Sequence, residues 1–121
     1  MLETSSPGIY ALGDCAEVAG HVLVYVAPLL AAGRALAATL TGNPTEVSYP
    51  ATPVTIKTPA CPVCVSPVAK DTEGSWTLSG EGSDIKGLFH SPNGQLLGFA
   101  LTGAAVKERM ALTKELPPIL D

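Results

Sequence analysis

The chain has 121 residues, which is the size of one domain, or of one small domain joined to a piece of another. With 46% hydrophobic and 15% charged residues, it has the composition of a chain that packs a core and not of a disordered one. The net charge is −4 and the seven basic residues are spread along the sequence, which argues against the concentrated basic face that nucleic-acid binding needs.

The first part of the sequence predicts a strand, a turn and a helix. The apolar run Gly8–Leu12 precedes Gly13 and is typical of a short buried strand that ends in a sharp turn. The segment Pro28–Leu40 is rich in alanine and leucine, its proline suits a first helical turn, and Gly42 provides a stop, so we expect a helix there. These elements bury nothing by themselves, so they look like the end of a larger domain.

The second part begins near residue 49. Prolines are frequent in residues 43–67, so the β-branched runs there are expected to be short edge strands. Further on, Asn93-Gly94 between two apolar runs is the strongest short-range signal for a β-hairpin. A helix is expected over residues 104–116, ended by two prolines. The expected strands are Val54–Lys57, Val63–Val65, Ser75–Leu78 (half-buried by its alternation), Ile85–His90 and Gln95–Leu101.

These elements predict an α+β protein in two parts. Residues 1–48 form the strand–turn–helix end of a larger domain. Residues 49–121 form a small three-stranded antiparallel sheet with a C-terminal helix across it.

Asp14 is the first candidate binding residue. A buried strand that ends in Gly13-Asp14 brings a carboxylate to the mouth of a sheet, where it can accept hydrogen bonds from sugar hydroxyls. The alternative is structural, with Asp14 capping a helix at Cys15-Ala16-Glu17 and Glu17 completing a capping box. The residues alone leave both interpretations open.

A longer pattern surrounds Asp14. Residues 4–14 read Thr-Ser-Ser-Pro-Gly-Ile-Tyr-Ala-Leu-Gly-Asp and resemble the second flavin motif of two-dinucleotide-fold flavoproteins, Thr-Ser-x-x-x-Ile-Tyr-Ala-x-Gly-Asp. The continuation through His21-Val22, Tyr25–Leu29 and Val54–Pro62 extends the similarity to nearly the whole chain. On these residues the sequence resembles the rubredoxin reductases, which are FAD-dependent members of the pyridine nucleotide-disulfide oxidoreductases.

The resemblance implies that residues 1–48 are the C-terminal end of a FAD-binding domain and that residues 49–121 are an interface domain where an electron acceptor docks. It places the ribityl chain of FAD on Asp14, behind Gly13. It also places the flavin pyrimidine ring at the backbone of Tyr25, Val26 and Ala27, where the helix begins. Unpaired backbone N–H groups and the helix dipole favour negative charge at such a position. From the residues alone, a plain apolar approach to the helix is the favoured interpretation of Tyr25-Val26.

Lys57 is a lone cation in an apolar stretch. By default such a lysine reaches solvent from an edge strand. The resemblance instead places Lys57 over the flavin, near the docking position of the acceptor, and both interpretations remain open.

Cys61 and Cys64 have the spacing of a redox or metal-binding pair. A reactive thiolate would need a helix N-terminus beside it, and none is expected there. A zinc site would need a second ligand pair, but only Cys15, His21 and His90 remain, at irregular distances. We therefore expect two structural thiols and no metal, and we interpret both histidines as structural or surface residues.

The implied activity is electron transfer from NADH through FAD to rubredoxin or a similar small iron protein. No Gly-x-Gly-x-x-Gly fingerprint for FAD or NADH occurs in the sequence. We therefore expect the C-terminal piece of a longer polypeptide, with no catalytic residue of its own and no activity alone. A free-standing dimerisation or protein-binding module is the alternative. The net charge of −4 offers no evident basic surface for an acidic rubredoxin.

Cysteine usage bears on the cellular compartment. Three cysteines, without a basic and apolar leader, predict a reduced, cytoplasmic protein. The longest apolar stretch, residues 22–33, is shorter than the about 20 residues that cross a membrane, so no membrane segment is expected. The apolar helix over residues 28–40 predicts self-association of the isolated chain.

Overall fold

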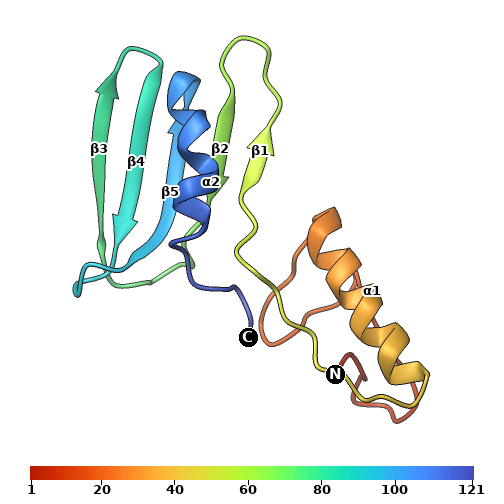
Figure 1. Ribbon diagram of the computed structural model, residues 1–121. Coiled ribbons are helices and arrows are strands. Elements are labelled where there is room, and N and C mark those ends of the chain that lie inside the picture. Colours follow the sequence, from red (N-terminus) through yellow and green to blue (C-terminus); the bar gives the residue numbers. More distant parts are fainter. The chain divides into compact units, whose positions relative to one another are not determined.

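The computed structural model describes all residues, 1–121, and divides into two compact units (Figure 1). Unit 1 consists of residues 1–50 together with 118–121, and it holds α1 (Val26–Leu40). Unit 2 consists of residues 51–117. Its elements are β1 (Val54–Ile56), β2 (Val63–Ser66), β3 (Ser75–Glu81), β4 (Asp84–His90), β5 (Leu96–Thr102), the 3-10 helix η1 (Gly103–Glu108) and α2 (Arg109–Thr113). The predicted α+β class is confirmed. No helix reaches the combination of length and apolarity that crossing a membrane requires.

Unit 2 is built on one antiparallel sheet of five strands, in the order β1-β2-β5-β4-β3. The predicted three-stranded sheet is therefore wrong. Of the two strands predicted to lie at an edge, β1 does so and β2 does not. The prolines that suggested edge positions lie just outside the strand ends, at Pro53, Pro62 and Pro67. Because no proline falls inside Val63–Ser66, β2 pairs with β1 on one side and with β5 on the other.

The hairpin at Asn93-Gly94 is confirmed and joins β4 to β5. Gly94 N–H donates to Ser91 O at 2.9 Å, and Ser91 N–H donates to Gln95 O at 2.9 Å. At the other edge, all seven residues of β3 are exposed in this chain, so the prediction of a half-buried strand there is wrong. The strand pairs only with β4. Its one aromatic contact is the edge-on packing of Trp76 against Phe89, whose ring centroids are 5.4 Å apart.

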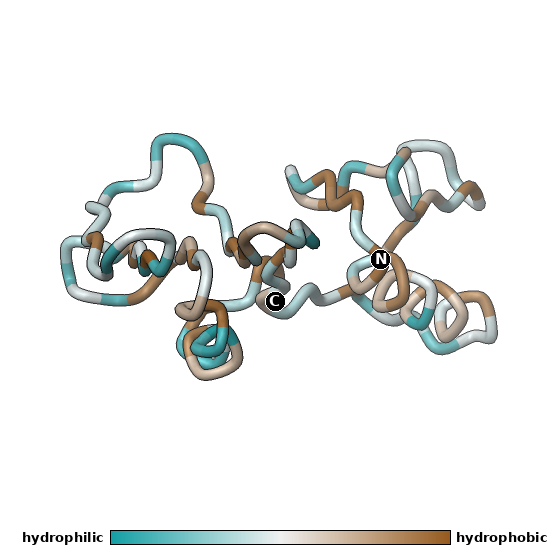
Figure 2. The backbone as a smooth tube through the Cα atoms, turned by 90° about the horizontal axis from the view of Figure 1, so that it is seen from above, coloured by the Kyte–Doolittle hydropathy of each residue, from teal (hydrophilic) through white to brown (hydrophobic).

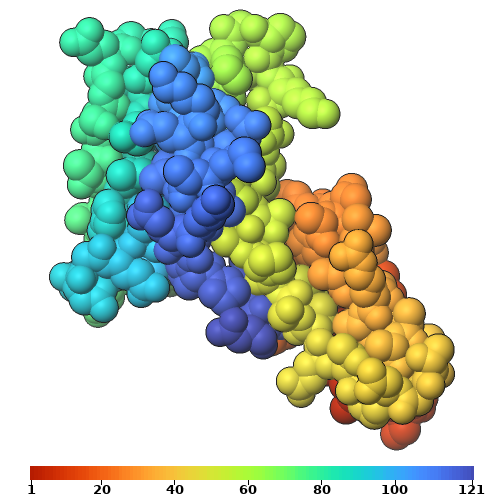
Figure 3. Space-filling view, in the orientation of Figure 1, coloured from red at the N-terminus to blue at the C-terminus, as the bar shows by residue number.

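One face of the sheet carries the core of unit 2. Cys64, Phe99 and Leu101 are fully buried there beneath η1 and α2, with Leu112 and Leu116 packed against them. Viewed from above, the coil of α2 lies on one face of the sheet (Figure 2), and the space-filling view shows it covering the middle strands (Figure 3). The helix predicted over residues 104–116 is present as η1 followed by the five-residue α2, so it is shorter and partly 3-10.

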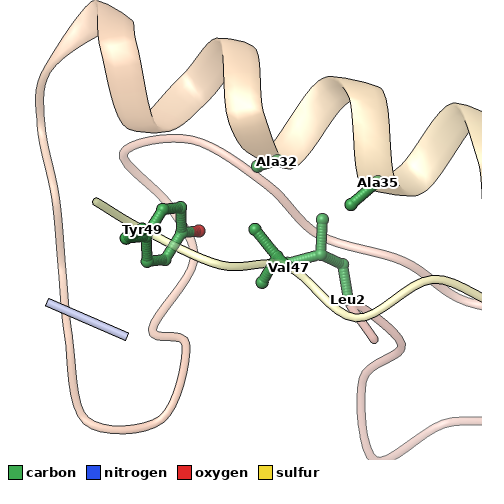
Figure 4. Close-up of a cluster of buried hydrophobic side chains, with 5 residues drawn as sticks. All are labelled: Leu2, Ala32, Ala35, Val47 and Tyr49. Atoms are coloured by element: carbon green, nitrogen blue, oxygen red, sulfur yellow. The ribbon is translucent and has the colours of Figure 1, made fainter. Parts of the chain in front are cut away.

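Unit 1 has a core of its own, so the prediction that its elements bury nothing by themselves is wrong. Ala32 and Ala35 point from α1 toward Leu2, Val47 and Tyr49 (Figure 4), and all five are buried. The small side chains of α1 let the returning segment approach the helix closely. The other sides of the helix are not covered by residues of this chain. Its large exposed apolar residues are Val26, Leu29, Leu30 and Leu40.

The segment Gly8–Leu12 does not form the predicted buried strand. Its only ladder contact is a single bridge between Tyr10 and Glu3, and Gly8 and Ile9 are exposed. A strand of this kind is stabilised by neighbours on both sides, and no other strand of this chain lies beside it.

The last four residues belong to unit 1. Tyr49 N–H donates to Leu120 O at 2.7 Å, and Tyr49 O accepts from the N–H groups of Ile119 and Leu120 at 2.8 and 3.1 Å. Ile119 and Leu120 also pack on the core of unit 1. The chain therefore leaves unit 1 after Pro50 and returns to it at Pro118.

Candidate functional site

Gly13 makes the turn that presents Asp14. Its φ of +84° lies in the left-handed region, and Ala16 N–H closes the turn by donating to Gly13 O at 3.0 Å. A Cβ atom at this position would stand 3.2 Å from Leu29 Cδ1 on α1. The backbone of the Gly13-Asp14 turn is therefore packed against the beginning of α1, and a side chain at residue 13 would push the two apart.

Asp14 is exposed, and its carboxylate accepts no hydrogen bond from the chain. Residues 14 and 15 form a turn and residues 16 and 17 are irregular, so no helix begins there. The alternative in which Asp14 caps a helix is therefore wrong. What remains is an unpartnered carboxylate at the edge of unit 1, with all of its acceptor capacity available to a ligand.

The beginning of α1 is uncapped. Tyr25 is the N-cap residue, its backbone is extended, and no side chain bonds to the free N–H groups of the first turn. Val26 and Ala27 are exposed, while Pro28, which has no N–H, is buried. Unpaired donors at the start of a 15-residue helix, with no acidic residue in its first turn, attract negative charge.

Five of the six predicted binding residues, Gly13, Asp14, Tyr25, Val26 and Ala27, belong to unit 1. Among them, Gly13 approaches Leu29 in the first turn of α1, the helix that follows Tyr25. Lys57 belongs to unit 2. It is exposed just beyond the end of β1, where Thr58 N–H donates to Ile56 O at 3.1 Å and the Thr58 hydroxyl donates to Cys61 O.

The two cysteines of unit 2 occupy different environments. Cys64 is fully buried on β2 and receives a hydrogen bond from the Thr55 hydroxyl at 3.8 Å. Cys61 is half-buried in the loop before β2, and its thiol lies 3.8 Å from the carbonyl oxygens of Pro62 and Ser83. Both thiols are free, and no three metal-binding side chains gather anywhere in the chain.

Two of the grooves in the chain bear on the candidate binding residues. One, of about 390 Å3, opens in unit 1 along residues 1–4, 11 and 15–19, and none of the predicted binding residues lines it. The other, of about 360 Å3, lies in unit 2 between β1 and α2. Figure 3 shows the boundary where the yellow-green atoms of β1 meet the blue atoms of α2. The second groove is lined by Pro53, Thr55, Cys64, Arg109, Met110, Thr113 and Lys114.

The sequence analysis did not single out Arg109, Met110 or Lys114. A signal was present, because Met110 and Lys114 stand four residues apart and must share one side of a helix. What the sequence lacked was the pairing of β1 into the sheet, which supplies the opposite wall of the groove.

Comparison with known proteins identifies the family of unit 2. Residues 46–116, more than half of the chain, match the rubredoxin-binding C-terminal domain family. The chain belongs to that family.

Similar proteins extend the match to nearly the full chain. The rubredoxin-NAD(+) reductase of Alcanivorax borkumensis is 63% identical over 119 residues, which cover 98% of this chain and 31% of that protein. The rubredoxin-NAD(+) reductase of Acinetobacter baylyi is 46% identical over 123 aligned positions, covering 99% and 31%. A nitric oxide reductase FlRd-NAD(+) reductase of Aliivibrio fischeri is 37% identical over 115 residues, covering 95% and 30%. The chain therefore spans less than a third of the length of these relatives, and the sequence resemblance to the rubredoxin reductases is confirmed.

Proposed function

We propose that this chain is the C-terminal part of an FAD-dependent NADH oxidoreductase that passes electrons to rubredoxin or a similar small iron protein. The observation that carries the proposal is the close approach of Gly13 to Leu29 in the first turn of α1. Gly13 precedes the unpartnered Asp14, and the helix that it approaches has no side-chain cap at its beginning. Membership of the rubredoxin-binding family supports the acceptor side of the proposal.

The residues present suit a flavin. Asp14 is exposed and unpartnered, so it accepts hydrogen bonds from the ribityl hydroxyls without giving up any bond within the chain. Gly13 allows the turn before Asp14 to lie against Leu29 of α1, because it has a φ of +84° and no side chain between the two. The backbone N–H groups of Val26 and Ala27, behind Tyr25, stabilise negative charge on the ring system. Lys57, in unit 2, is the sixth residue that we assign to the flavin, on the resemblance to the family alone.

When bound, FAD would supply the redox chemistry that couples two-electron hydride transfer from NADH to two single-electron transfers to the acceptor. The role of this chain is to hold one side of the cofactor, to favour its negative charge and to present the acceptor surface. The flavin-contacting residues of unit 1 and the acceptor surface of unit 2 are not sufficient for turnover, because no dinucleotide fingerprint occurs in the chain. The other two thirds of a full-length protein would provide both nucleotide sites, and residues 1–48 and 49–121 would divide the remaining tasks between flavin contact and acceptor docking.

We propose the cytoplasm as the compartment. All three cysteines are free, and one of them is exposed. Free exposed thiols are usual where glutathione and thioredoxin keep proteins reduced.

A free-standing protein-binding module is the second candidate, and one observation favours it. Unit 2 has a complete core of its own, with Phe99, Leu101 and Cys64 fully buried. Such a unit would bind a partner without any cofactor.

The test of the flavin assignment is Asp14→Ala in the full-length polypeptide, with Glu17→Ala as the matched control, since Glu17 is an exposed acid three residues away. Loss of charge-assisted hydrogen bonds should weaken FAD binding by about 1.5–3 kcal/mol. Flavin retained after dialysis is read from its visible absorbance. The control should keep its flavin, and the 121-residue chain alone should be colourless and unable to oxidise NADH. If Asp14→Ala kept its flavin as well as the unsubstituted protein, the assignment of Asp14 would be wrong.

A further inference from the structure

The groove between β1 and α2 has the composition of a protein-docking surface. Its floor is the buried Cys64, its rim carries Met110, and Met110 is 69% exposed although it is a large apolar side chain. An unbranched thioether adapts its shape to different partner surfaces. The lining includes two cations, Arg109 and Lys114, and no carboxylate.

Those two cations have no acidic partner in the chain. The only salt bridge joins Lys86 to Glu108 at 3.2 Å, and neither residue lines the groove. Arg109 donates to Val106 O at 3.3 Å, a bond that leaves the rest of the guanidinium available. Two unpaired positive charges beside an exposed apolar side chain fit a partner surface with carboxylates around an apolar centre.

The net negative charge of the chain does not oppose this, because it resides in unit 1. Residues 1–50 and 118–121 hold one basic residue, Arg34, against five acidic ones, which gives the whole −4. Residues 51–117 hold six basic and six acidic residues and are neutral. The expectation from the sequence, that no basic dock is evident, followed from averaging two units of different charge.

We propose that this groove is where unit 2 receives the acidic surface of rubredoxin. The inference rests on the proposed function and adds the location. Seven lining residues are fewer than a permanent interface uses, and a small, charge-guided contact gives the weak and rapidly exchanging complex that an electron carrier needs. Lys57 follows Thr55 by two residues, just beyond the end of β1, and is a further basic residue of unit 2 on this part of the chain.

The test measures binding of iron-loaded rubredoxin to the immobilised 121-residue chain at low and high salt. The variant is Arg109→Gln with Lys114→Gln. The matched control is Lys70→Gln with Lys107→Gln, which removes the same charge from unit 2 outside the groove. We expect the groove variant to bind about tenfold more weakly at low salt and with a smaller salt dependence, and the control to bind within about twofold.

A second pair of variants tests the contribution of the apolar Met110 side chain of the groove to rubredoxin binding. Met110→Gln and Leu78→Gln remove apolar side chains of nearly equal exposure, 69% and 71%, from the groove and from β3 respectively. At high salt, where charge is screened, only Met110→Gln should weaken binding. Circular dichroism on every variant establishes that the fold is intact.

The outcomes separate the two levels of inference. Equal weakening by the groove and control pairs, or no weakening by Met110→Gln, overturns the groove while rubredoxin binding itself stands. Failure of the unsubstituted chain to bind rubredoxin at any salt concentration overturns the groove and the proposed acceptor together.

Discussion

Removing the last four residues should loosen unit 1 and leave unit 2 folded. Tyr49 makes three backbone hydrogen bonds with this tail, and Ile119 and Leu120 are half-buried against the core around Ala32 and Ala35. At about 1 kcal/mol for each bond and each half-buried side chain, deletion of residues 118–121 should cost unit 1 about 4–5 kcal/mol. A unit of about 50 residues has little stability beyond that.

Amide hydrogen exchange measures this directly. A loss of that size should speed exchange of the α1 amides about a thousandfold, because each 1.4 kcal/mol is a factor of ten, while the amides that join β4 to β5 keep their protection. The control is Ile119→Ala with Leu120→Ala, which keeps the backbone bonds and should produce a smaller effect. If the α1 amides of the truncated chain exchanged as slowly as those of the intact chain, residues 118–121 would not contribute to the stability of unit 1, and the reasoning would be refuted.

Two further predictions concern the thiols and the bare helix. The double variant Cys61→Ser with Cys64→Ser should leave electron transfer in the full-length protein largely unchanged. The hydroxyl at the buried position 64 should lower its thermal stability. A stably folded double variant that no longer transfers electrons would assign the pair a redox role. The 121-residue chain should self-associate at micromolar concentration through Leu29, Leu30 and Leu40 of α1. The double variant Leu30→Gln with Leu40→Gln should self-associate less, as measured by sedimentation. A monodisperse monomer of the unsubstituted chain would contradict this prediction, because it would show that these side chains do not drive association.

The parts of the fold that local sequence specifies were predicted well. Helix α1 follows from alanine and leucine content and from a proline in its first turn, and it begins only two residues before the predicted position. The β4–β5 hairpin follows from Asn93-Gly94, since those residues favour the backbone of a tight turn.

The parts that depend on distant pairing were not predictable from local signals. The bonds between Tyr49 and Leu120 join residues 71 positions apart, and nothing near either residue announces the other. The inner position of β2 was hidden because prolines flank it, although none interrupts it. The candidate site shows the same division. Gly13 and Asp14 were visible as a motif, but their packing against Leu29 and the groove beside Arg109 arise only when the elements assemble.

Unit 2 is one uninterrupted segment, residues 51–117, and the residues on either side of it are held next to each other within unit 1. In topological terms it is an insertion. A segment with adjacent ends can be replaced by another of different length at little entropic cost, because its host needs no new loop closure. If unit 2 binds the electron acceptor, as proposed, replacing residues 51–117 as one segment would change the acceptor and leave the residues assigned to the flavin in unit 1 unchanged.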